Sequence, residues 1–263
     1  MREKEYTVLP PDREEKVLEI FVRDASFYRT FFPLLFVIVL QQLAALAVNL
    51  ADNIMLGRYS ELALSGASLV NQLQFTLQQI AAGIGMGIVV LAAQYWGQKR
   101  TGPIKKIISL GVKCGFLSGV IFFAISQLTP AGVLGLFTGD EEVIAEGMRY
   151  LKVICWTYPV FGLSNSLMYA LQSVETAMIG TVMSCSTICI NVCLNYCFIY
   201  GNFGAPELGI VGAAVATLVS RLVELGIILV YILFRDKKLH MKLWEILKWD
   251  GTYLQDYLKV STP

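Results

Sequence analysis

The chain has 263 residues, of which 56% are hydrophobic and only 16% are charged, and its mean hydropathy is +0.60. A soluble domain of this length cannot bury so much apolar surface, because a single core is filled well before that point. The surplus is expected to face lipid. The formal net charge of +1 gives no electrostatic support for nucleic-acid binding.

Six stretches are long and apolar enough to cross a hydrocarbon core about 30 Å thick, which takes about 20 helical residues. They are apolar on all sides, which is typical of membrane spans rather than of surface helices. The predicted fold class is an all-α membrane protein, a six-transmembrane-helix bundle. The predicted spans are 33–56, 69–96, 107–128, 148–171, 177–200 and 208–234.

Lys and Arg are concentrated on one side of this predicted bundle. Sixteen of the 21 lie in the segment 1–32, in the loop at 97–106 or in the segment 235–263. Cytoplasmic segments of membrane proteins carry this excess of positive charge. A multi-pass protein of the cell (plasma) membrane is therefore expected, with both termini in the cytoplasm, as an even number of spans requires.

Both flanks are amphipathic. Apolar residues recur among charges at helical spacing, as at Val17, Leu18 and Phe21 near one end and at Leu243 and Leu247 near the other. Such segments are typical of interfacial helices lying on a leaflet. The predicted organisation is a cytoplasmic N-terminal segment at 1–32, a transmembrane lobe at 33–234 and a cytoplasmic connector helix at 235–263.

The most informative single residue is Asp52, a carboxylate inside the first predicted span. A charge there costs about 2.5–3.5 kcal/mol on insertion scales, and such residues are functional by default. Asn49 lies one turn earlier, on roughly the same face. The alternative is that Asp52 merely caps the span near the outer surface, close to Gly57.

Two further polar pairs lie within the spans. Asn191 and Asn195 are four residues apart and share one face of the fifth span. Their carbonyl oxygens suit Na⁺ coordination or a hydrogen-bonded carboxylate, and bonds between helices worth about 0.6–2 kcal/mol are the open alternative. Arg221 and Glu224, one turn apart in the sixth span, are expected to form a structural ion pair, with a proton path as the alternative.

No metal site or catalytic centre is expected. The six cysteines include no CxxC pair, so neither a disulfide framework nor a zinc site is predicted. Four of them repeat at intervals of four in the fifth span, where cysteine behaves as a small buried apolar residue. P-loop, nucleophile-elbow and HExxH motifs are missing from the sequence, so an enzymatic activity and a cofactor are not expected. In the first two spans, Gln41, Gln42, Gln72, Gln74, Gln78 and Gln79 could polarise a cavity or bond helices together.

Several segments together have the order found in one transporter family. They are Pro33 at the start of the first span, NLADNIMLG at 49–57, the glycine-rich stretch at 83–97, and the segments 191–201 and 209–217. On these residues, which cover nearly the whole chain, it resembles the MATE (multidrug and toxic compound extrusion) family. The wider group also contains polysaccharide and lipid flippases.

The resemblance implies a secondary active antiporter that exports bulky, often cationic drugs or metabolites in exchange for H⁺ or Na⁺. It implies a cation-coupling site made of Asp52, Asn191, Asn195 and Thr217, and Asn49 is added to it because it shares the helix face of Asp52. Family members carry an Asp where this chain has Asn195. The missing charge disfavours tight Na⁺ binding and favours H⁺ as the coupling ion.

The resemblance also implies two homologous six-helix lobes with the substrate cavity between them. One lobe is present here, so we expect a fragment or a half-transporter that dimerises. The expected partners are the lipid bilayer, an amphiphilic small-molecule substrate and a second six-helix lobe, either the missing C-terminal half or a homodimer mate. A lipid-linked oligosaccharide flippase is one alternative, although the spans offer only Lys113 and Arg221 for its pyrophosphate. A non-transporting membrane scaffold is the other, and it leaves Asp52 without a role.

Overall fold

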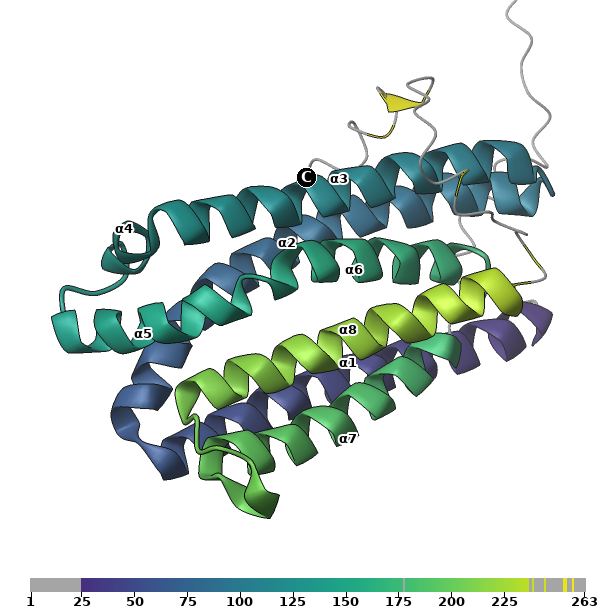
Figure 1. Cartoon of the computed structure of the whole chain (residues 1–263). Helices are drawn as coiled ribbons and strands as arrows, with labels where there is room; N and C mark the ends of the chain where they lie inside the picture. The colour runs from purple at the N-terminus through teal and green to yellow at the C-terminus, as the bar shows by residue number, and fades with distance from the viewer. Residues whose placement is uncertain are drawn as a thin grey trace, which may run out of the picture.

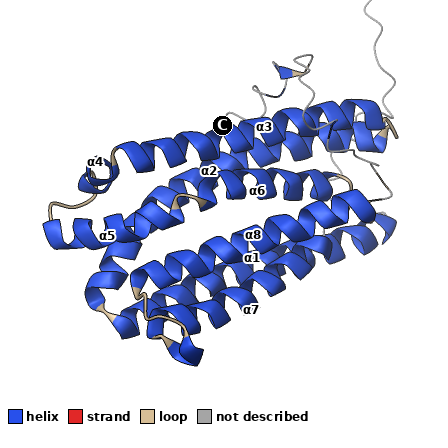
Figure 2. Cartoon of the chain, viewed as in Figure 1, coloured by secondary structure: helices blue, strands red, loops and turns tan. Residues whose placement is uncertain are grey.

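The computed structural model describes residues 25–176 and 178–236, together with residues 238, 244, 253, 254 and 257. Every regular element in this part of the chain is helical (Figure 2). The long helices run side by side in one elongated bundle (Figure 1). The predicted all-α membrane fold is thus confirmed.

Short connections join successive helices. Ser60 alone separates the first two, and its Oγ accepts the Ala63 N–H at 3.4 Å. Asp140 caps α5 by accepting the N–H groups of Glu142 and Val143 at 3.0 and 3.3 Å. The elements are α1 (Ala25–Tyr59), α2 (Glu61–Gly97), α3 (Thr101–Leu128), α4 (Pro130–Gly135), α5 (Glu141–Ile154), α6 (Thr157–Ser173), α7 (Met178–Tyr200), η3 (Asn202–Gly204) and α8 (Ile210–Phe234).

Five of the described helices, α1, α2, α3, α7 and α8, are long and apolar enough to cross a membrane. The fourth predicted span, 148–171, is not one helix. It is divided between α5 and α6, which meet at Cys155 and Trp156. Pro159 accounts for the break, because its ring clashes with the carbonyl of the residue four positions earlier, Cys155. That carbonyl instead accepts the N–H of Tyr158 at 3.0 Å.

The first helix begins before the predicted start of its span at residue 33, and its apolar part that could cross a membrane is Phe31–Tyr59. Helix α1 begins at Ala25 and continues through Pro33, because an interior proline removes one hydrogen bond without ending a helix that packing supports. Residues 1–24, with the predicted N-terminal interfacial helix, lie outside the described residues. So do Leu243 and Leu247 of the predicted connector helix.

The buried apolar side chains form two clusters near opposite ends of the bundle. One surrounds Ile88 and Ile228, and the other surrounds Leu77 and Ile210. Helix α6 packs against α2, α3 and α8, while α7 packs against α1 and α8. On α8, Ile210 and Ile228 belong to different clusters, so the polar residues between them lie near the middle of the bundle.

The described residues of the segment 235–263 lie against the end of the bundle where α2 and α6 terminate. Tyr257 is buried in the first cluster, and its hydroxyl donates to the Ile84 carbonyl at 2.5 Å. The Lys238 ammonium donates to the Val174 carbonyl at 2.6 Å and lies 5.5 Å from the centre of the Trp96 ring. These contacts hold the described residues of the predicted connector against the lobe.

Candidate cation and substrate site

A chain of hydrogen bonds joins α1, α7 and α8 near the middle of the bundle. Asn195 on α7 donates through Nδ2 to Oδ1 of Asp52 on α1 and, at 3.0 Å, to Oδ1 of Asn191. Asn191 donates through its own Nδ2 to Oγ1 of Thr217 on α8 at 3.2 Å. Four of the five residues of the predicted site are therefore bonded in one network.

The local sequence explains how this network forms. Asn191 and Asn195 lie one turn apart, so both point from α7 toward the same neighbours. Both are fully buried, and a buried amide is stable only if it finds hydrogen-bond partners. Asp52 and Thr217 supply these partners from the two helices that pack on α7. The Asn195 Oδ1 has no hydrogen-bond partner within the described structure.

A cavity of about 40 Å³ adjoins the network. One water needs only about 10–15 Å³ of such space, so the cavity has room for a few waters or for a small cation. Asn49, the fifth residue of the predicted site, lines this cavity with Asp52, Asn191, Thr217 and Arg221. Four of the five predicted residues thus line one small polar space, and the fifth, Asn195, is bonded to two of them, Asp52 and Asn191.

A larger cavity of about 300 Å³ lies beside the small one and shares Asn49 and Arg221 with it. Most of the polar residues that line it are uncharged amides. Its aromatic lining residues are Phe161 and Tyr169. The ion pair of Arg221 and Glu224 also lines it. The amide residues are Gln41, Gln42, Asn49, Gln78, Gln79, Asn165 and Gln172.

The predicted pair of Arg221 and Glu224 forms within α8, with Nη1 and Oε2 2.7 Å apart. The two side chains are 22% and 13% exposed, so both reach the cavity rather than the packed core. The Arg221 guanidinium carbon lies 5.2 Å from the centre of the Phe161 ring, a distance at which a cation is attracted to the ring face. Arg221 therefore has partners on two helices.

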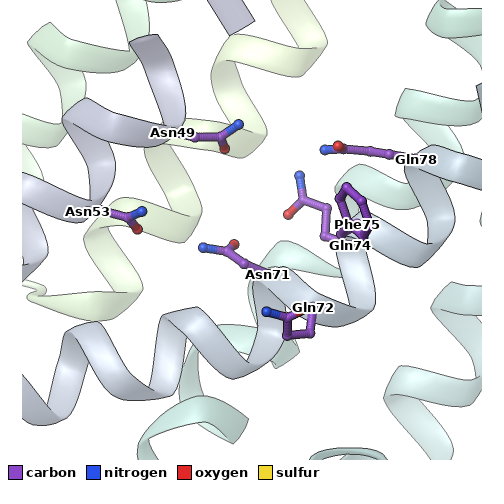
Figure 3. Close-up of a pocket in the computed structure, with 7 residues that line it drawn as sticks. All are labelled: Asn49, Asn53, Asn71, Gln72, Gln74, Phe75 and Gln78. Carbon is purple, nitrogen blue, oxygen red and sulfur yellow. The ribbon is translucent and has the colours of Figure 1, made fainter. Parts of the chain in front are cut away.

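A third hollow, of about 410 Å³, lies between α1 and α2. Its lining side chains come from both helices and face one another across it (Figure 3). Phe75 is its aromatic residue, and the others are amides. The amides are Asn49, Asn53, Asn71, Gln72, Gln74 and Gln78.

Asn53 and Asn71 are the residues that the sequence analysis missed. A signal for them exists in the spacing: Asn53 lies four residues after Asn49, and Asn71 lies three residues before Gln74 and seven before Gln78. Such spacing places amides on one helix face.

The sequence predicted no metal site. In the described parts of the chain, no group of three or more His, Cys, Asp and Glu side chains could hold a metal ion.

Comparison with known proteins finds similarity to one family. Residues 37–197 match the family model described as MatE. A Thermotoga maritima protein named "Probable multidrug resistance protein NorM" is 32% identical over 203 residues, which are 74% of this chain and 42% of that protein. A Rhizobium meliloti protein of the same name is 32% identical over 200 residues, 76% of this chain and 42% of that protein. The chain thus spans less than half the length of these curated relatives.

Solved structures agree on the fold. A crystal structure of MATE in the bent conformation superposes with a TM-score of 0.77 at 21% sequence identity. The match covers 89% of this chain and 50% of that one. The helices described here therefore have the arrangement of half of that molecule.

Proposed function

The chain belongs to the MATE family, and on that premise we propose that it forms one lobe of a secondary active transporter that exports organic molecules in exchange for a cation. The observation that carries the proposal is the Asp52 carboxylate, held inside a membrane-spanning bundle beside a cavity of about 40 Å³. The curated relatives are named as multidrug resistance proteins, which supports bulky, often cationic drugs or metabolites as the substrates.

The proposed coupling ion is H⁺. The Asn195 amide suits both protonation states of Asp52, because Nδ2 donates to the carboxylate and Oδ1 can accept from the carboxylic acid once the amide turns over. That oxygen has no partner among the described atoms, so turning the amide costs only the bonds that Nδ2 makes to Asp52 and Asn191. With Asn195 in place of a second acid, the site carries one negative charge, which favours a proton over tightly bound Na⁺.

A second six-helix lobe is the proposed partner. Gln42, Gln72 and Gln79 are exposed on α1 and α2, and polar side chains facing hydrocarbon are unfavourable unless they are paired or hydrated. This amide-rich face therefore suits the wall of a water-filled cavity closed by another lobe. The alternative of a flippase for pyrophosphate-linked lipids has less support, because Arg221 is the one basic residue among the linings of the three polar cavities, it lines two of them, and Glu224 already pairs with it.

The requirement for a second lobe can be tested in cells. We expect the 263-residue chain expressed alone to confer no resistance to ethidium in an efflux-deficient bacterium, because one lobe supplies only one wall of the cavity. Joined to a C-terminal MATE lobe, it should raise the minimum inhibitory concentration several-fold. The proposal is wrong on this point if the chain alone confers full resistance while crosslinking detects only monomers.

The orientation is a second prediction. With both termini in the cytoplasm, the connection before α5 faces outward and the connection between α2 and α3 faces inward. In a chain whose six cysteines are replaced by serine, a membrane-impermeant maleimide should label Glu141→Cys in intact cells. It should label Arg100→Cys only after permeabilisation. The unlabelled cysteine-free parent is the control, and the reverse labelling pattern at either position would refute the orientation.

A further inference from the structure

Arg221 lies between two carboxylates that belong to different cavities. Among the described residues it is the only charged one that lines both the cavity of Asp52 and the larger cavity of Glu224. Thr217, Ser220, Arg221 and Glu224 follow one face of α8 at intervals of three and four residues. The hydrogen-bond network around Asp52 and the ion pair with Glu224 are therefore neighbours on one helical stripe.

The charges around this stripe do not balance. Asp52 on α1 and Glu224 on α8 can each carry a negative charge, whereas Arg221 carries the one positive charge. The other titratable side chains lining the two cavities are Tyr150 on α5 and Tyr169 on α6. Helices α2 and α7 contribute amides, hydroxyls and Ala82 to these linings, and none of these side chains is titratable. With both carboxylates ionised, the group has a net charge of −1, and one bound monovalent cation neutralises it.

The Arg221 guanidinium is placed to respond to that imbalance. It donates to Glu224 at 2.7 Å. It also lines, together with Asp52, a cavity of only about 40 Å³. A guanidinium has five N–H donors in a planar fork and can bind carboxylates on more than one edge. The Phe161 ring beside it provides a face along which the cation can shift while it keeps its contact.

We infer that Arg221 is a switch between the two carboxylates, and that Glu224 binds the positively charged group of the substrate. When Asp52 is protonated, Arg221 remains on Glu224, and the large cavity offers no free anion. When Asp52 loses its proton, the guanidinium is drawn toward it, and Glu224 becomes free to bind an organic monocation. The three residues then accept one positive charge at a time, either H⁺ at Asp52 or substrate at Glu224. This inference rests on the proposed function and supplies its exchange step.

Ethidium binding to the 263-residue chain in lipid nanodiscs tests the switch, because ethidium stays cationic across the pH range used. Fluorescence anisotropy would give its Kd at pH 6.0 and pH 8.5. For the wild-type chain we expect binding at least tenfold tighter at pH 8.5, where Asp52 is ionised. A wild-type chain that fails to bind ethidium at pH 8.5 would overturn the inference.

The variants separate a switch from a structural lock. Arg221→Gln leaves Glu224 permanently free, so ethidium should bind about tenfold tighter than to the wild type at pH 6.0, with little change between the two pH values. Glu224→Gln removes the binding group, so binding should be weak at both. Asp52→Asn holds Arg221 on Glu224, so binding should again be weak at both.

A matched control exists on α5, where Glu146 and Arg149 form a pair of the same spacing, 2.9 Å apart. Arg149→Gln should behave as the wild type. The switch is refuted if Arg221→Gln folds and binds ethidium no better than the wild type at pH 6.0. The Arg221–Glu224 ion pair would then be purely structural. If Arg221→Gln does not fold, Asp52→Asn decides, because tight binding to it at pH 6.0 would also refute the switch. Neither result bears on the proposed exporter function, which is tested separately by coupled efflux from the two-lobe protein.

Discussion

Replacing Asp52 with Asn in a transporter completed by its second lobe should abolish coupled efflux while leaving expression and folding intact. Asparagine has the shape of aspartate and keeps a side-chain oxygen that can accept the Asn195 N–H. What it removes is the charge and the ability to bind and release a proton. One charge moving down a 100 mV potential supplies about 2.3 kcal/mol, enough for about a fifty-fold substrate gradient at 1.4 kcal/mol per decade. Without that charge, no gradient should form.

The assay is efflux of ethidium from proteoliposomes under an imposed pH gradient or an imposed Na⁺ gradient. Asp140→Asn is the matched control, because it makes the same change in a carboxylate that caps α5 and should keep wild-type efflux. Asn191→Ala should weaken coupling without eliminating it, and Cys193→Ala, on the exposed side of α7, should be nearly silent. Wild-type efflux by the Asp52→Asn protein would show that this carboxylate caps a helix and does nothing more.

The second large effect is expected at Gly162, where α6 meets α3. A Cβ atom added at this position would lie 2.0 Å from the Gly115 carbonyl oxygen, so the two backbones would have to separate. Small residues at such crossings let membrane helices pack closely, and overpacking of a tight interface costs about 1–3 kcal/mol, occasionally more. Because the clash is with backbone and not with a flexible side chain, Gly162→Ala should reach the upper end of that range and lower the yield of folded protein severely.

Gly226 on α8 provides the comparison, because a Cβ there meets no atom within 4 Å. Gly226→Ala makes the same chemical change inside a long helix and should leave folding unchanged. The measurement is the fraction of each variant that remains monodisperse in size-exclusion chromatography after a series of heating steps. Equal thermal midpoints for the two variants would mean that the α3 and α6 backbones can separate freely at this crossing.

Features that repeat along a single helix were predictable without the structure. Apolar runs of 20 or more residues predicted helices in a membrane, since composition and length decide that property locally. The intramembrane carboxylate of Asp52 and the shared face of Asn191 and Asn195 were likewise visible, because the spacing of four residues is a property of the helix itself. The ion pair of Arg221 and Glu224 is local in the same sense.

Features that depend on how separate helices face one another required the tertiary structure. The bond between Asp52 and Asn195 joins residues 143 positions apart, and the rotation of α1 and α7 about their axes decides whether these side chains meet. The position of Arg221 beside two cavities depends in the same way on the packing of α8 against its neighbours. The sequence by itself thus determined the membrane-spanning class and the polar residues of each helix, because periodicity and hydropathy are local. Only tertiary packing decided which of those residues share one site, because that depends on contacts between helices far apart in the chain.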